Sequence, residues 1–157
     1  MMNHVLENCL IVAVLIAIIL IPVRLSILRS RKRKKQKIDN ELKAAEKDKD
    51  LCFQHIDQLD AFVIALDPVK KKLIQMGQAD YQIDLIDLRE IVSCVLEEKK
   101  QGDTLQLLQL GLRDKNQKAS HIVFYKQYQH NEWHLKKTIR MAAKWKLLIQ
   151  DTIRQAA

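Results

Sequence analysis

An apolar run followed at once by a dense basic run is the feature that most constrains this chain of 157 residues. Cys9–Val23 contains no charged residue, and Val5 and Leu28 extend the apolar pattern on either side. A helix over residues 5–28 would be about 36 Å long, which is enough to cross the hydrocarbon core of a bilayer. The sequence therefore predicts a single transmembrane helix within residues 1–28.

The basic run forms a collar over residues 29–37. It consists of Arg29, Arg31, Lys32, Arg33, Lys34, Lys35 and Lys37. Positive flanks of a membrane span stay in the cytoplasm, so the pattern predicts an outside N-terminus and a cytoplasmic segment 29–157, with a bacterial inner membrane as the default. The collar also indicates contact with anionic membrane lipids.

Composition and spacing after the collar favour helices. The chain has only three Gly and two Pro, which argues against a sandwich or barrel. Apolar residues recur at spacings of three and four from Ile38 to Leu66, which is a coiled-coil heptad pattern broken only by Lys49. A two-stranded seam would make a homo-oligomer, whereas Phe53 and Phe62 widen the apolar face and favour a bundle within one chain.

The predicted fold class is all-α, with a small cytoplasmic helical bundle over residues 38–157. A stalk helix covers 38–66, and Asp67-Pro68 ends it because Pro restricts the residue before it. Short helices fill 68–112 between isolated glycines, and a C-terminal helix covers 118–156. The segment starting at His121 is β-branched and aromatic, which also permits a short strand, but with no partner strand in view we expect a helix there.

Signatures of chemistry are sparse. His130 and His134 stand four residues apart, a spacing that can hold zinc on one helical face, but a zinc site needs three or four ligands. There is no phosphate-binding glycine loop and no nucleophile elbow. The cysteines Cys9, Cys52 and Cys94 are far apart and read as small apolar residues. We therefore expect no enzyme, no cofactor and no bound metal.

The pattern favours a single-pass membrane-anchored helical interaction protein, a subunit or adaptor of a membrane-associated complex. Its partners would be other proteins of that complex, bound through apolar residues that the fold leaves exposed; the candidates are Ile56, Leu59, Val63, Leu135, Ile139 and Ala142. The alternative is a membrane-tethered binder of nucleic acid or anionic lipid that uses the basic C-terminal helix. A third hypothesis is a small metalloenzyme using His130 and His134.

Charge layout weighs against nucleic acid as the partner. The net charge of +8 divides into +7 over residues 1–37, −6 over 38–112 and +7 over 113–157. Blocks of opposite sign attract each other within one chain, so the global charge alone is poor evidence for a phosphate-binding surface.

Overall fold

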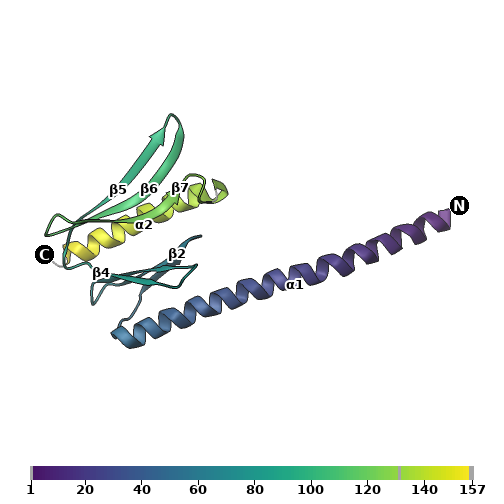
Figure 1. Ribbon diagram of the computed structural model, residues 1–157, viewed down its shortest axis with the longest axis horizontal. Helices are drawn as coiled ribbons and strands as arrows, with labels where there is room; N and C mark the ends of the chain where they lie inside the picture. The colour runs from purple at the N-terminus through teal and green to yellow at the C-terminus, as the bar shows by residue number, and fades with distance from the viewer. Residues whose placement is uncertain (1, 131, 156–157) are drawn as a thin grey trace. The chain divides into compact units, whose positions relative to one another are not determined.

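The structure is a computed structural model that falls into two compact units, Met1–Ala44 and Ala45–Ala157. It describes the backbone of residues 2–130 and 132–155, and the side chains of residues 16, 18–30, 32–130 and 133–155. The first unit consists of helix α1 (Met2–Lys49), whose last turn belongs to the second unit (Figure 1).

The predicted transmembrane helix is not supported. Among the described residues, no helix combines the length and the apolar character that crossing a bilayer requires. This finding contradicts the single-pass topology, with its outside N-terminus and cytoplasmic C-terminal domain. The side chains of residues 2–15, which include part of the apolar run, lie outside the described residues. The collar lies on α1, where the described side chains of residues 29–37 are exposed.

Helix α1 ends at Lys49 because the backbone turns left-handed at the next residue. Asp50 has φ +49°, and the Leu51 amide N–H donates to the carbonyl oxygen of Glu46 at 2.8 Å. A left-handed residue followed by this six-residue bond is the Schellman helix end. The predicted stalk helix over 38–66 is therefore wrong beyond Lys49. Of the later heptad positions, Ile56, Val63 and Leu66 lie in strands, and Cys52 and Leu59 lie outside them.

The second unit contains seven strands, which contradicts the predicted all-α bundle. Sheet A is an antiparallel meander in the order β1-β2-β3-β4, and sheet B is a second meander in the order β5-β6-β7. The strands are β1 (His55–Gln58), β2 (Phe62–Asp67), β3 (Lys72–Gly77), β4 (Ile83–Asp87), β5 (Ile91–Gln101), β6 (Thr104–Asp114) and β7 (Ala119–Lys126). A short helix η1 (Glu132–His134) and helix α2 (Leu135–Arg154) follow.

The turn between β2 and β3 shows why strands replace the predicted helices. Asp67 is fully buried, and its Oδ1 accepts the N–H groups of Val69 and Lys70, both at 2.9 Å. This is the capping chemistry expected at Asp67-Pro68. Lys71 then takes φ +56°, however, and the chain folds back as a hairpin with Leu66 opposite Leu73.

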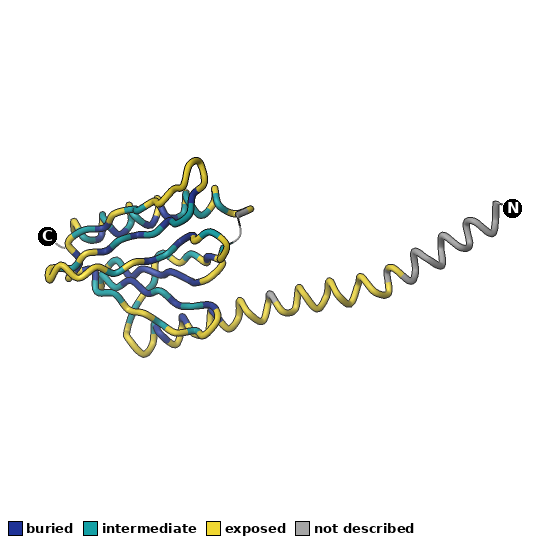
Figure 2. Tube along the Cα trace, turned by 45° about the horizontal axis from the view of Figure 1, so that its top comes forward, coloured by how far each residue is buried: buried dark blue, intermediate teal, exposed yellow. Residues whose placement is uncertain are grey.

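One core lies inside the second unit, between the two sheets and α2. Phe62 on β2 and Phe124 on β7 meet edge to face, with ring centroids 5.7 Å apart. Trp145 and Ile149 on α2 are fully buried in the same cluster. Figure 2 shows the buried positions along the strands of the second unit, and exposed positions in the turns and in the outer part of β5.

Helix α2 packs on sheet B, where it contacts β5, β6 and β7. Its inward face carries Ala142, Trp145 and Ile149. The predicted helix over 118–156 is wrong in its first part, because β7 pairs with β6 and places Ile122 opposite Leu110. The partner strand that the sequence did not reveal is thus residues 104–114, which had been expected to form a short helix.

Candidate functional site

The connection from β7 to α2 carries the most unusual exposed side chains of the second unit. Tyr128 is 92% exposed and Trp133 is 94% exposed. Large aromatic side chains dominate the energetics of binding interfaces, and the burial of two such rings by a partner would contribute strongly to affinity. We name the surface formed by Tyr128, Trp133, Lys136, Lys137 and Arg140 the aromatic-basic corner.

A tight turn after β7 holds Tyr128 in place. The amide N–H groups of Gln129 and His130 both donate to the carbonyl oxygen of Lys126 at 3.1 Å. Tyr128 itself has φ +65°, a backbone conformation that non-glycine residues adopt rarely and at some cost. The turn therefore presents the Tyr128 ring outward from a fixed and strained position.

His130 fastens this turn to the end of β7. Its Nδ1 lies 2.9 Å from the backbone N of Lys126, and its ring lies 6.1 Å from the ring of Tyr125. A backbone N–H can only donate, so in the neutral imidazole Nδ1 accepts and the ring proton lies on Nε2. In this arrangement neither ring nitrogen of His130 offers a lone pair to a metal.

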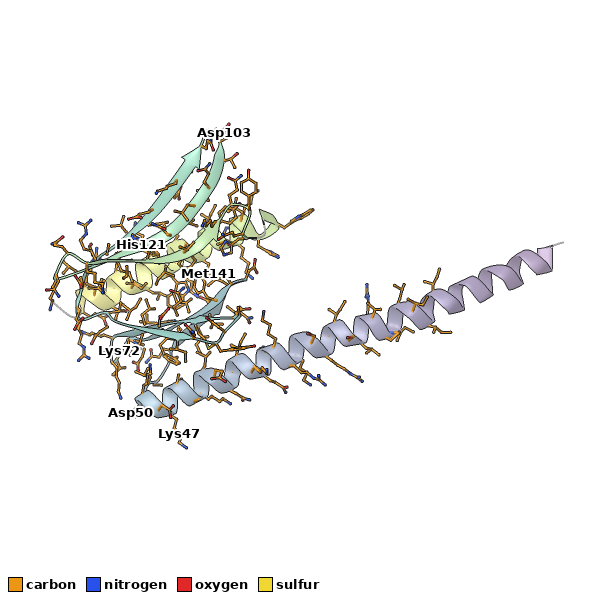
Figure 3. All side chains as sticks on the ribbon, viewed as in Figure 1. Lys47, Asp50, Lys72, Asp103, His121 and Met141 are labelled. Atoms are coloured by element: carbon orange, nitrogen blue, oxygen red, sulfur yellow. The ribbon has the colours of Figure 1, made fainter. Side chains whose placement is uncertain are left out.

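The predicted histidine pair does come together. His130 and His134 both line a pocket of about 80 Å³ that also contacts Asp60, Lys137 and Met141 (Figure 3 labels Met141). Sites for small organic molecules usually have volumes of about 300–1,000 Å³, so this pocket is small for a substrate. Among the described residues, no three His, Cys, Asp or Glu side chains are placed to hold a metal ion.

Exposed cations follow Trp133 along α2. Lys136, Lys137 and Arg140 are exposed and form no salt bridge with any described residue. Lys144 differs, because its Nζ lies 2.6 Å from Oδ2 of Asp57 on β1. The corner therefore offers three cations to a ligand, and a fourth is already engaged within the fold.

A second hollow of about 120 Å³ lies on sheet B, away from the corner. Gly111 on β6 is paired with Val95 on β5 on one side and with His121 on β7 on the other. His121 is labelled in Figure 3. A Cβ at Gly111 would lie 2.6 Å from Oε1 of Glu97, so the glycine leaves room for that carboxylate. Gln109 Nε2 donates to the other oxygen of Glu97 at 2.6 Å, so this carboxylate is already engaged.

The fold uses most of the apolar residues that sequence reasoning proposed for partner binding. Leu59, Val63 and Ala142 are buried, and Leu135 and Ile139 are partly buried against the core. Ile56 on β1 is the one that stays 49% exposed. The sequence pattern does not single out Trp133 and Tyr128 as surface residues, because spacing alone does not distinguish an exposed aromatic residue from a buried one.

Comparison of the chain with protein-family models, with curated proteins and with solved structures gave no match.

Proposed function

We propose that the Ala45–Ala157 domain is a non-catalytic protein-binding module, and that its partner contacts the aromatic-basic corner. The observation that carries this proposal is the near-complete exposure of Tyr128 and Trp133, together with three exposed cations that pair with none of the residues whose side chains are described. Trp, Tyr and Arg are the residues that most often dominate protein interfaces. The small pockets described in the domain are consistent with a ligand that binds on the surface.

The alternative is a surface for nucleic acid or anionic lipid, which exposed aromatic rings beside cations also suit. The limited number of cations favours protein. Three phosphate contacts, from Lys136, Lys137 and Arg140, would give a slope of about −2 to −3 for log affinity against log salt. Strong sequence-independent binders of nucleic acid make about six to ten such contacts.

Site-specific photo-crosslinking in the native host tests the proposal. A benzoylphenylalanine residue replaces Trp133 in one full-length variant and Val69 in the control variant. Val69 is 74% exposed and lies on the β2–β3 turn, so it reports random collisions. We expect a light-dependent adduct at position 133 that protease removes and nuclease does not, and none at position 69.

Two results would overturn the proposal. An adduct at position 133 that nuclease removes would assign the corner to nucleic acid. Equal protein adducts at positions 133 and 69 would show that the corner has no preferred partner.

A further inference from the structure

The exposed face of α2 continues the aromatic-basic corner along the helix. Leu147 follows Arg140 by seven residues, so the two lie along one side of α2. Trp133 stands seven residues before Arg140, on the short helix η1 that precedes α2. Leu147 is 60% exposed although it is a large apolar residue, and Ala143 between it and Arg140 is also exposed. We name Trp133, Arg140, Ala143 and Leu147 the outer stripe.

Within α2 the outer stripe runs from Arg140 to Leu147, which is about 10 Å or two helical turns, and Trp133 lies before the start of the helix. The small side chain of Ala143 near its middle lets a second helix approach closely. Apolar contacts repeated at spacings of three, four and seven residues are the pattern by which one helix recognises another. The stripe therefore matches a helical ligand better than an extended one.

Over most of α2 the charge beside the outer stripe has one sign. At its two ends Glu132 precedes Trp133 in the sequence, and the exposed Asp151 follows Leu147 by four residues. From Leu135 to Gln150 helix α2 contains no acidic residue. Lys136 and Lys137 lie on the same exposed side as Arg140 and form no ion pair with a described residue. A partner that covered these cations without supplying carboxylates would leave them desolvated and unpaired, which is costly.

We infer that the outer stripe binds an acidic amphipathic helix of a partner protein. This inference rests on the proposed function and names the class of its partner. Apolar side chains of that helix would cover Trp133, Ala143 and Leu147, and its carboxylates would pair with Lys136, Lys137 and Arg140. The outer stripe provides the apolar contact, and the cations beside it fix the orientation of the bound helix. Only a helix whose carboxylates lie beside its apolar face can make both kinds of contact at once.

A defined peptide probe tests the inference with the full-length chain. The probe is a fluorescein-labelled, helix-stabilised peptide of about four turns, with Leu at spacings of three and four and Glu beside them. The control peptide has the same composition, shuffled so that Leu and Glu share no face. We expect anisotropy to show affinity at least about tenfold higher for the amphipathic peptide than for the shuffled one.

Variants of the chain locate the binding surface. Arg140→Glu and Leu147→Asp should each weaken the amphipathic peptide by about tenfold or more. Lys115→Glu makes the same charge change as Arg140→Glu at an exposed lysine in the β6–β7 turn, and it should leave the affinity within about twofold. Near-ultraviolet circular dichroism of the buried Trp145 verifies that each variant is folded.

The outcomes separate this inference from the proposed function. Equal affinity for the shuffled peptide, or no effect of Leu147→Asp, overturns the helix inference. If the peptide experiment gives either of these results but the protein adduct at position 133 is still observed, the proposed protein-binding function stands and only the inferred class of partner is wrong. Tighter binding of an oligothymidylate than of the acidic peptide, lost in Trp133→Ala, overturns both.

Discussion

Asp57 on β1 accepts a hydrogen bond from the indole Nε1 of the buried Trp145 on α2, at 2.9 Å. The ammonium of Lys144 donates to the same carboxylate oxygen at 2.6 Å. One side chain of sheet A therefore fastens the helix that packs on sheet B. This link sets the orientation of α2, and with it the direction in which the outer stripe faces.

Removal of the Asp57 carboxylate should destabilise the second unit. Asp57→Ala leaves the buried indole N–H of Trp145 without an acceptor, which costs about 1–3 kcal/mol in the free energy of unfolding. Urea denaturation of the full-length chain measures the change. Asp60→Ala, at an exposed aspartate in the β1–β2 turn, is the control and should stay within about 0.5 kcal/mol. Equal losses in both variants would contradict the role assigned to Asp57.

Replacement of the buried Asp67 should destabilise the second unit more than replacement of Asp57. Its two carboxylate oxygens accept the N–H groups of Cys52, Val69 and Lys70 at 2.8–2.9 Å. Asp67→Ala leaves three backbone donors without this acceptor and should lower the free energy of unfolding by about 2–4 kcal/mol. Asp67→Asn keeps one acceptor oxygen, so denaturation should show a smaller loss. An alanine variant as stable as wild type would refute this account of the turn.

Asp87 should make the free energy of unfolding depend on pH in the acidic range. Burial raises the pKa of Asp87, but hydrogen bonds from Arg89 and Lys72 outweigh burial and lower it to about 2. A carboxyl whose pKa is lower in the folded state stabilises the fold above its unfolded pKa, and this contribution is lost as pH falls through the folded value. About 1–2 kcal/mol should therefore disappear between roughly pH 4 and pH 2, allowing for solvent screening of the partly exposed pair.

Denaturation midpoints at several pH values measure this effect. Asp87→Asn should flatten the dependence on pH in that window, because the neutral side chain no longer titrates. Asp84→Asn, on the same strand at an exposed position, should keep the wild-type slope. A slope that survives Asp87→Asn would mean that other carboxyl groups cause the acid dependence.

Two cysteines of the second unit should differ sharply in reactivity. Burial raises the pKa of the Cys94 thiol to about 11, against a smaller lowering by Lys146, and Cys52 is exposed. The thiolate is the reactive form, so Cys94 should resist Ellman's reagent in the native protein and react on unfolding. In a Cys9→Ser background, about one thiol should react at once and a second only in denaturant. Rapid reaction of both thiols would show that Cys94 is accessible.

The sequence alone determined several local features. Apolar residues at helical spacing mark the inward face of α2, where Trp145 and Ile149 are buried; Ala142, which was expected to stay exposed for a partner, is buried beside them. A break in the chain at Asp67-Pro68 followed from the restriction that a proline places on the residue before it, although the break joins two strands and does not end a helix. Both features depend on residues within a few positions of one another, which is the range over which a sequence pattern is informative.

Strand formation was decided by the tertiary structure. All six residues of β2 are buried, so this strand shows none of the alternation that identifies a half-buried strand. Its apolar residues instead continued a helical spacing that began in α1. Residues 119–126 form a strand because β6 supplies its hydrogen-bonding partner, and that pairing cannot be read from either segment alone.

The candidate site also needed the fold. Trp133 and Trp145 both stand among the lysines and arginines of the C-terminal segment, yet Trp133 is 94% exposed and Trp145 is fully buried. Only the fold distinguishes the cations of α2, since Asp57 on β1 pairs with Lys144 while Arg140 is exposed and pairs with no described residue. The exposure of a side chain and its ion pairs depend on how the elements pack against one another. The sequence therefore determines which residues α2 contains, and the packing of α2 determines which of them face outward.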